Sequence, residues 1–228
     1  MIVVLKGKTV VVTGGLGTLG RAVVKAAAAQ GAQVVSVDCV DGEAPEGAIS
    51  NHRIDLLDGQ ATAEGMAAIA QAQGGIDALV NVAGGFRWET VMDGSVDTWD
   101  FLYQLNVRTA VNACRGAIPH IPSTGGRIVN ISAAGSVKAD MGLGAYAASK
   151  AGVSKLTEAL AAELKAANVT VNAVMPSIID TAPNRADMPD ADFETWVKPS
   201  ALADVIVFLL SPAAEAVTGA LIPVTGRV

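Results

Sequence analysis

The sequence predicts an α/β fold in which short parallel strands alternate with longer helices. First, β-branched runs such as Val10–Val12 are separated by Ala-rich stretches that are long enough for helices. Second, each pair of parallel strands needs a crossover, and a helix-length segment lies in nearly every gap. Third, a glycine-rich turn at residues 14–20 joins the first strand to the first helix. Together these observations favour a parallel sheet that is covered by helices.

Six strands are predicted from short apolar runs, and a weaker seventh from His52–Asp55. The six are Thr9–Thr13, Gln33–Asp38, Ala78–Val82, Arg127–Ser132, Thr170–Val174 and Ala220–Val224. The helices between them are predicted at Thr18–Ala29, Gln60–Gln73, Val96–Ala117, Ala145–Ala167 and Pro199–Leu210. The region 177–198 lacks clear periodicity, which is typical of a lid or binding loop. We therefore expect one domain over residues 1–228, with a substrate lid at about 177–198.

The composition restricts the class of protein. The 228 residues are 51% hydrophobic and 17% charged, which suits a chain with a large core. The net charge of -6 argues against a nucleic-acid partner, because phosphates attract a basic face. Cys39 and Cys114 lie far apart in the chain and suggest neither a disulfide framework nor a metal cluster. No signal peptide or membrane-spanning run is evident, so we expect a cytoplasmic protein with no membrane partner.

The segment Thr13–Gly20 is a candidate site for the pyrophosphate of a dinucleotide. It follows an apolar strand and opens an Ala-rich helix, which is the context that such a motif requires. Glycines allow a tight turn and a close approach of the backbone to the pyrophosphate, which would lie at the helix N-terminus. The predicted contacts are Gly14, Gly15, Leu16, Gly17, Thr18, Leu19 and Gly20.

Asp38, at the end of the second strand, predicts which dinucleotide binds. Its separation from the glycines is close to that at which an acidic residue binds the adenosine ribose. A carboxylate there repels a 2′-phosphate, so NAD(H) is favoured over NADP(H) as the cofactor. Arg21 is the one nearby cation that argues for NADP(H).

Two further strand ends are predicted to line the same site. Asp55 and Leu56 follow the weak third strand and are expected to frame the adenine; alternatively, Asp55 caps the next helix. Small residues after the fourth strand leave room for a ligand at the carboxyl end of the sheet, where open α/β folds bind their ligands. The predicted contacts there are Asn81, Ala83 and Gly84.

Tyr146 and Lys150 are the candidate acid–base residues. They lie four residues apart at the start of an Ala-rich segment, so one face of a helix would present both. A tyrosine has a pKa of about 10 and exchanges protons poorly at neutral pH. A lysine cation a few ångströms away favours the tyrosinate and would lower that pKa. The pair therefore indicates proton transfer by Tyr146; the alternative is an exposed pair on an ordinary helix.

The order and spacing of these motifs resemble those of the short-chain dehydrogenase/reductase family over essentially the whole chain. The matching residues are the glycine-rich turn, Asn81–Gly84, Asn106, Tyr146 with Lys150, and Pro176…Thr181. The resemblance implies a single-domain Rossmann fold with a doubly wound, seven-stranded parallel sheet and helices on both faces. It also implies an oxidoreductase that transfers a hydride between NAD(H) and a small carbonyl or alcohol substrate.

The resemblance assigns roles to several of these residues. Tyr146 would exchange the proton with the substrate oxygen, and Lys150 would bind the nicotinamide ribose while lowering the tyrosine pKa. Ile179 and Thr181, which follow Pro176, would position the nicotinamide carboxamide, and all three are predicted cofactor contacts. The turn itself departs from the common family form, because Thr18 takes the position of the middle glycine; phosphate binding remains the expectation.

Two more residues complete the predicted catalytic group. The resemblance implies that Asn106 holds a water molecule in a proton relay; alternatively, it bonds the backbone within a helix. The family's serine lies thirteen residues before the tyrosine, and that position here is Ala133. Ser132 is one residue earlier, and its side chain is expected to point to the other face of the strand. It can take the role of the catalytic serine only if the backbone adjusts at the strand end. Ser136 is the weaker alternative.

An alanine at this position, with Val82–Gly85 and Asn184–Phe193, resembles the dihydropteridine-reductase branch of the family. In that branch a quinonoid pterin is reduced and the serine is dispensable. Reduction of a C=N bond in a pterin-like ring is therefore the alternative activity. A further alternative is an idle protein that senses NAD(H), against which the intact Tyr146/Lys150 pair argues.

Apolar residues near these motifs are candidates for a substrate pocket. They are Phe86, Trp88, Met141, Leu143, Met188, Phe193 and Trp196. Arg87 either pairs with an anionic or ring-carbonyl group or is a solvated loop cation. The two long helices have Ala-rich faces, and the family resemblance implies a homodimer or homotetramer that forms through them.

Overall fold

The computed structural model describes residues 3–228, and at its centre lies a seven-stranded sheet. All neighbouring strands are parallel, and their order is β3-β2-β1-β4-β5-β6-β7. The order reverses between β1 and β4, as in a doubly wound sheet, so the predicted fold class is confirmed. The strands are β1 Thr9–Thr13, β2 Gln33–Asp38, β3 Ala48–Arg53, β4 Ala78–Asn81, β5 Gly126–Ile131, β6 Val169–Pro176 and β7 Leu221–Val224.

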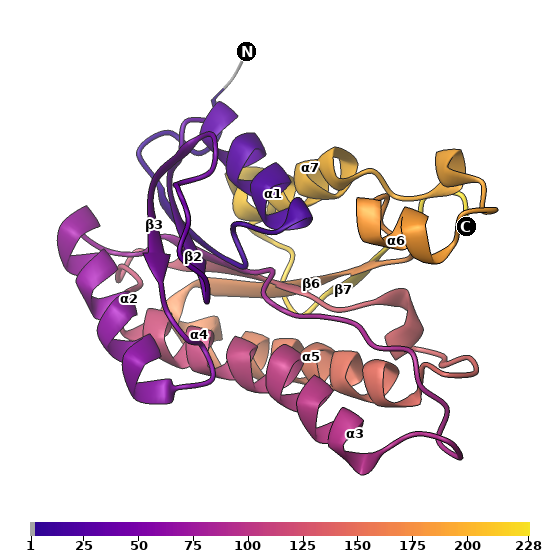
Figure 1. Cartoon of the computed structure of the whole chain (residues 1–228). Coiled ribbons are helices and arrows are strands. Elements are labelled where there is room, and N and C mark those ends of the chain that lie inside the picture. The colour runs from indigo at the N-terminus through magenta and orange to yellow at the C-terminus, as the bar shows by residue number, and fades with distance from the viewer. Residues whose placement is uncertain (1–2) are drawn as a thin grey trace.

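Helices cover both faces of the sheet (Figure 1). Helices α1 and α7 pack against each other on one face. Helices α2, α4 and α5 lie on the opposite face, and α3 leads into α4 and packs against α5. The helices are α1 Thr18–Ala29, α2 Gly59–Gln73, α3 Val96–Tyr103, α4 Thr109–Ala117, α5 Gly144–Glu163, α6 Ala182–Asp187 and α7 Pro199–Leu210.

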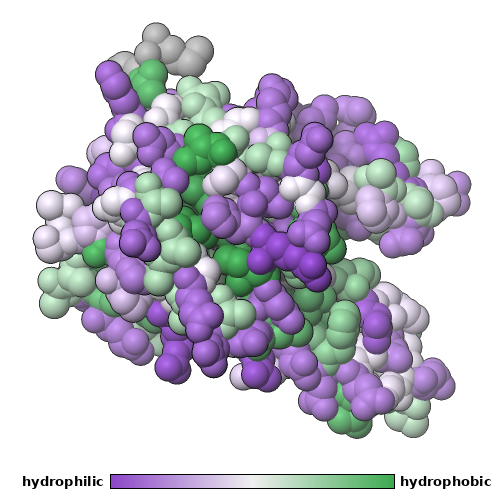
Figure 2. All heavy atoms as spheres, turned by 60° about the vertical axis from the view of Figure 1, so that its left-hand side comes forward, coloured by the Kyte–Doolittle hydropathy of each residue, from purple (hydrophilic) through white to green (hydrophobic). Residues whose placement is uncertain are grey.

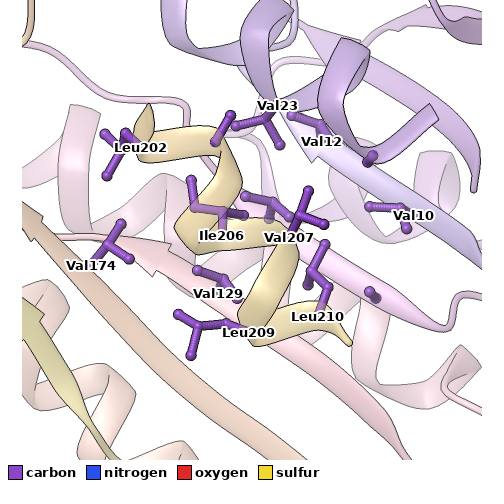
Figure 3. Close-up of a cluster of buried hydrophobic side chains, with 14 of the residues drawn as sticks. Val10, Val12, Val23, Val129, Val174, Leu202, Ile206, Val207, Leu209 and Leu210 are labelled. Carbon is purple, nitrogen blue, oxygen red and sulfur yellow. The ribbon is translucent and has the colours of Figure 1, made fainter. Parts of the chain in front are cut away.

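The sheet is buried from both sides, and β1 shows why its sequence is continuously apolar. Val10 and Val12 belong to the core cluster on the α1/α7 face, whereas Val11 belongs to the cluster on the α2/α4 face. Successive strand residues point to opposite faces, so a strand covered on both sides needs apolar residues throughout. Figure 3 shows Ile206 of α7 beside Val129 of β5 in the first cluster. Full burial of each such side chain contributes about 1.5–3 kcal/mol.

Several predicted elements differ from those observed by a few residues at their ends, and three regions differ more substantially. β3 spans Ala48–Arg53 rather than His52–Asp55; this edge strand is mostly half-exposed and polar, so it lacks the apolar run that marks the other strands. The predicted helix Val96–Ala117 is divided by a π-helical turn at Gln104–Arg108. The region 177–198 is not irregular, because it contains α6 and a short 3₁₀ helix.

The molecular surface is hollowed between two lobes. Figure 2 shows this notch at the right, between an upper lobe, which by its place in Figure 1 carries α6, and a lower lobe that carries α3 and the start of α5. The visible face is mainly hydrophilic, with separate hydrophobic areas. None of the helices formed by residues 3–228 is both long and apolar enough to cross a membrane.

Candidate active site

The glycine-rich turn brings α1 close to the ends of β1 and β4. Gly14 has a φ of +64°, and a Cβ atom there would lie 2.8 Å from the backbone nitrogen of Ala83. A Cβ atom on Gly20 would lie 2.0 Å from the carbonyl oxygen of Gly14. Both positions therefore require glycine, and the turn can pack this tightly only because these side chains are missing.

The N-terminus of α1 is available to an anion. Its N-cap is Gly17, which has no side chain to accept hydrogen bonds from the N–H groups of the first turn. In contrast, the side chains of Asp58 and Ser95 cap α2 and α3. Uncapped N–H groups and the helix dipole attract phosphate groups. This end of α1 therefore fits the pyrophosphate of a dinucleotide.

A cavity of about 410 Å³ lies beside the turn. The predicted cofactor contacts that line it are Gly14, Gly17, Thr18, Leu19, Gly20, Asp38, Asp55, Leu56, Ala83 and Gly84. Gly15 and Leu16 do not belong to the lining; Gly15 lies against Ser36, and Leu16 lies against Gly42. Sequence reasoning missed five lining residues, namely Cys39, Leu57, Val82, Leu105 and Thr109. The first three adjoin predicted contacts, whereas the last two had only their closeness to Asn106 as a signal.

The carboxylate of Asp38 is fixed at this cavity. It accepts hydrogen bonds from the backbone N–H groups of Leu16 at 3.1 Å and Cys39 at 2.8 Å. These bonds tie the end of β2 to the glycine-rich turn. The nearby cation Arg21 donates instead to the carbonyl oxygen of Leu16, with an Nε–O distance of 2.8 Å. Arg21 is therefore held by the turn and forms no ion pair with Asp38.

Asp55 also lies at the cavity, and it does not cap α2. Its carboxylate accepts a hydrogen bond from the N–H of Leu57 at 2.9 Å. The N-cap of α2 is Asp58, whose side chain accepts from two N–H groups of the first turn. The alternative interpretation of Asp55 as the helix cap is therefore wrong, because the helix begins later than that interpretation requires.

Asn81 lies outside the cavity lining, in the protein interior. Its Nδ2 donates to Oδ1 of Asn130 at 2.9 Å and to Sγ of Cys114 at 3.3 Å. Asn130 in turn donates to Thr157 of α5 at 2.8 Å. Asn81 is 3% exposed, so its side chain joins β4 and β5 to the helices beneath them. Its side chain is therefore directed away from the cavity, and a contact of Asn81 with the cofactor remains a prediction.

Tyr146 and Lys150 both lie near the start of α5, one turn apart. The half-buried ring of Tyr146 packs edge-on against Phe86, with 4.9 Å between the ring centroids. Lys150 is buried, and its Nζ donates to the carbonyl oxygen of Ile131 at 2.8 Å. The same Nζ lies 3.4 Å from the position that a Cβ on Gly84 would take. Because Gly84 lines the cavity, the lysine places the pair beside the dinucleotide site.

Burial shifts the pKa values of the pair in opposite directions. It raises the pKa of Tyr146 to about 12 and lowers the pKa of Lys150 to about 8. The expected lowering of the tyrosine pKa by Lys150 does not occur in this structure. Desolvation disfavours the tyrosinate, while the ammonium group is engaged by the Ile131 carbonyl oxygen. Tyr146 is therefore protonated at neutral pH and suited to donate a proton.

Asn106 lies within the π-helical turn and connects three segments. Its Oδ1 accepts from the N–H of Gly85 at 2.9 Å. Its Nδ2 donates to the carbonyl oxygen of Gly85 at 3.0 Å and to Oγ of Ser149 at 3.0 Å. The side chain thus fixes the loop after β4 to α5, rather than bonding the backbone of its own helix. The relay through water remains a prediction.

Ser132, Ala133 and Ser136, the candidates for the family's serine position, follow β5, and none of them is placed as predicted for a catalytic serine. Ser132 is 1% exposed, and its Oγ donates to the carbonyl oxygen of Lys150 at 2.9 Å. Ala133 is 4% exposed and offers no hydroxyl. Ser136 is half-buried, lies 3.3 Å from Ser132 and donates weakly to Met175. Because the strand end does not adjust, Ser132 faces α5, and this geometry opposes its predicted catalytic role.

The segment after β6 is held by its own contacts. Pro176 ends β6, and Ile179 pairs with Val197 in an isolated parallel bridge. Thr181 caps α6 by accepting from the N–H of Asn184. None of these predicted nicotinamide contacts lines the 410 Å³ cavity, so their role remains a prediction.

An apolar rim, formed by Phe86 and Trp88 of the loop after β4, lies against Tyr146 and the segment before α5. The indole N–H of Trp88 donates to the carbonyl oxygen of Met141 at 3.1 Å, which joins the loop after β4 to the segment before α5. Phe86 and Trp88 are both 54% exposed. The guanidinium of Arg87 lies over the ring of Phe101 at 4.6 Å and donates to a threonine of α3. Arg87 is therefore an exposed cation that packs on α3, and its pairing with a substrate group remains a prediction.

The fold and this site define a class of protein, namely dinucleotide-binding oxidoreductases of the Rossmann type. The family model described as "short chain dehydrogenase" matches residues 8–192. The chain is 31% identical to a 3-oxoacyl-[acyl-carrier-protein] reductase of Thermotoga maritima, over 97% of this chain and 98% of the relative. It is 32% identical to a meso-2,3-butanediol dehydrogenase of Serratia marcescens, over 96% and 93%.

Solved structures agree with these relatives. The chain resembles a short-chain dehydrogenase/reductase from Serratia marcescens with a TM-score of 0.87 and 27% identity, covering 98% of each chain. It also resembles a carveol dehydrogenase from Mycobacterium avium in complex with NAD, with a TM-score of 0.87 and 25% identity, covering 97% of each chain. The protein belongs to the short-chain dehydrogenase family of oxidoreductases.

Proposed function

We propose that this protein transfers a hydride between NAD(H) and a small carbonyl or alcohol substrate, with Tyr146 as the acid and base. The main support for this proposal is the position of Lys150, which is buried between the Ile131 carbonyl oxygen and the Gly84 backbone at the dinucleotide cavity. One helical turn earlier, Tyr146 presents a half-buried phenol. A proton donor and a dinucleotide site are thus adjacent.

A bound nicotinamide dinucleotide supplies the hydride donor or acceptor. The Tyr146 phenol donates its proton to a carbonyl oxygen; in the reverse direction its phenolate removes the proton from an alcohol. Lys150 would bind the ribose hydroxyls of the cofactor, and with the cofactor bound its positive charge would stabilise the phenolate that forms when Tyr146 releases the proton. Asn106 keeps the loop after β4 fixed against α5 through Gly85 and Ser149. Its further role with a water molecule belongs to the same proposal.

The preference for NAD(H) over NADP(H) is supported by Asp38. Its carboxylate is fixed by two backbone N–H groups at the cavity, where a 2′-phosphate would meet a negative charge. Arg21 donates to the carbonyl oxygen of Leu16 and is held away from that carboxylate. Arg53 pairs with Asp41 at 3.0 Å. Both cations near this edge therefore have other partners.

Reduction of a C=N bond in a conjugated ring is the second candidate. One observation favours it: the serine position holds Ala133, and the neighbouring Ser132 hydroxyl is directed into α5. A ketone would then receive a hydrogen bond from Tyr146 without a serine hydroxyl beside it. The apolar rim around Phe86 and Trp88 suits a flat ring.

We also propose a cytoplasmic homodimer or homotetramer that forms through the long helices. The exposed aromatic side chains of α3, Trp99, Phe101 and Tyr103, would be covered by a second copy. Sedimentation analysis should give a mass of two or four chains. A monomer at all concentrations would reject this assembly.

The activity is tested by following the absorbance of NADH as it is oxidised with three kinds of substrate. The panel contains small ketones such as acetoin, bulky aromatic ketones, and quinonoid dihydropterin. Turnover of a ketone supports the leading proposal, and turnover of the pterin alone supports the second. Tight NADH binding without turnover of any of them would contradict both.

A further inference from the structure

Both ends of Lys150 are held by two consecutive residues at the end of β5. The carbonyl oxygen of Ile131 accepts a hydrogen bond from Nζ of Lys150 at 2.8 Å. The next residue, Ser132, donates from Oγ to the backbone carbonyl oxygen of Lys150 at 2.9 Å. The strand end therefore fixes both the head group of the lysine and the helical backbone from which the side chain extends.

The hydroxyl of Ser132 is fully engaged in this contact. It also lies 2.8 Å from Oγ of Ser154, one turn further along α5, and Ser154 donates to the same Lys150 carbonyl oxygen at 3.3 Å. Ser132 is 1% exposed and Ser154 is 5% exposed. A hydroxyl that is buried against a helix backbone cannot reach a substrate on the open side of Tyr146.

We propose that Ser132 is a positioning residue, which holds α5 in register with β5 so that the Lys150 ammonium group stays beside Gly84. This inference rests on the proposed function of the Tyr146/Lys150 site. It gives the serine a role that does not involve the substrate and leaves Ala133 without a replacement hydroxyl. The proton donor to the substrate is then Tyr146 alone.

The position of Lys150 explains why this contact matters. Nζ lies 3.4 Å from the position that a Cβ atom on Gly84 would take, so the ammonium group faces the backbone of the loop after β4. Movement of the ammonium group away from this position would break the bond to the Ile131 carbonyl oxygen and expose the amine to water. A small shift of α5 relative to β5 thus changes the environment of Lys150, and shifts of this size strongly affect catalytic geometry.

The first test compares Ser132→Ala with Ser211→Ala in the intact protein. Ser211 is a matched control, because it is 3% exposed and its Oγ donates to the carbonyl oxygen of Phe208 at 2.7 Å, at the end of α7. Both changes remove a buried hydroxyl from a helix carbonyl group, and only the first adjoins Lys150. Titration of ¹³C-labelled lysine side chains by NMR, without cofactor, should show a higher pKa for Lys150 in Ser132→Ala only.

The second readout is the affinity for NADH in the absence of substrate, measured by fluorescence. Ser132→Ala should raise the Kd by about 3- to 10-fold, the effect of one lost hydrogen bond, while Ser211→Ala leaves it unchanged. If Ser132→Ala does not fold, Ser132→Cys retains a weak donor of similar size and should shift both readouts in the same direction. Smaller changes of the Lys150 pKa and the NADH Kd in Ser154→Ala than in Ser132→Ala would confirm that the hydrogen bond from Ser132 is the more important one.

The two readouts also separate this inference from the proposed function. An unchanged Lys150 titration in Ser132→Ala or Ser132→Cys overturns the positioning role, whatever the cofactor affinity. An unchanged NADH Kd with a lower kcat for the substrate would instead assign Ser132 to the substrate. If the unaltered protein fails to bind NADH, the proposed function fails, and the titration still decides the role of Ser132.

Discussion

The two halves of the candidate site are built in different ways. The half that would hold the adenosine and pyrophosphate is an open cavity beside a bare backbone turn, with Asp38 fixed at its side. The half that would carry out proton transfer is a closely bonded group of side chains, in which Lys150 is held by Ile131 and Asn106 by Gly85. Cofactor binding should therefore depend mainly on the free space in the open half, with a smaller contribution from Lys150, and turnover on the placement of a few polar groups in the bonded half. Substitutions in the two halves should separate these properties.

The largest effect is expected in the bonded half, from Tyr146→Phe. Loss of the phenol hydroxyl should lower kcat by about 10²- to 10⁴-fold, because no other group described at the site replaces this proton donor. The Kd for NADH should change far less, which pre-steady-state kinetics and fluorescence titration can establish. Tyr103→Phe is the matched control, since this second tyrosine lies exposed on α3. Retention of more than about a tenth of kcat in Tyr146→Phe would refute the acid–base role.

The next effect belongs to the open half, where Gly14→Ala should block dinucleotide binding. The added methyl group would lie 2.8 Å from the Ala83 nitrogen, so the turn or the β4 loop must move. We expect the NADH Kd to rise at least about tenfold and the free energy of unfolding to fall by about 1–3 kcal/mol. Isothermal titration and denaturant unfolding measure the two quantities.

Gly7→Ala separates backbone strain from the clash. Gly7 has a φ of +73°, close to that of Gly14, but nothing lies within 4 Å of its Cβ position. This variant should lose about 1 kcal/mol of stability and keep its affinity for NADH. Equal Kd values for the two glycine variants would show that the turn does not contact the cofactor.

A smaller effect is expected from Asp38→Asn in the same half. The neutral amide keeps an oxygen that can accept from the Leu16 N–H but no longer repels a 2′-phosphate, so the ratio of NADH to NADPH affinity should fall by about tenfold. Glu43→Gln removes an exposed carboxylate from the same loop after β2 without freeing Arg53 from Asp41, and it should leave the ratio unchanged. Competition binding with both cofactors gives the ratios. An unaltered preference in Asp38→Asn would remove the assignment of this residue.

The open half could be predicted from the sequence because it depends on local patterns. The bounds of β1, α1 and β2 agree with the prediction, since apolar runs and the glycine-rich turn define them. The position of Asp38 follows directly from the end of β2. Such features are set by neighbouring residues in the chain, so one sequence is sufficient to locate them.

The bonded half could be predicted only in part, because long-range contacts decide which way its polar groups point. The sequence identified Tyr146 and Lys150, but not that the Ile131 carbonyl oxygen holds the lysine. Asn81 fits the expected strand end, yet its amide bonds Asn130 from the next strand. The orientation of each group depends on a partner far away in the chain, which no local pattern reveals.

The pH dependence of turnover should connect the two halves through Lys150. Burial lowers the pKa of this lysine to about 8, while that of Tyr146 is raised to about 12. In the direction of carbonyl reduction, Tyr146 stays protonated, but the ammonium group is lost as the pH rises through about 8. We expect kcat/KM to fall by about tenfold per pH unit above this value. Lys150→Arg should lower the overall rate, because arginine does not replace lysine equivalently. The fall of kcat/KM above pH 8 should disappear in this variant, because the guanidinium remains charged.

Stability should change in the opposite direction over the same interval, which distinguishes a titration from unfolding. The folded-state pKa of Lys150 lies below its ordinary value of 10.5, so above pH 8 the unfolded chain binds more protons and the contribution of Lys150 to stability rises with pH. The Cys114 thiol, whose pKa burial raises from 9.0 to about 12, opposes this trend only above pH 9. Between pH 8 and 9 the free energy of unfolding should therefore hold or increase while kcat/KM falls. A parallel decline of both, measured by denaturant unfolding and initial rates, would show that lost turnover reports unfolding rather than the charge of Lys150.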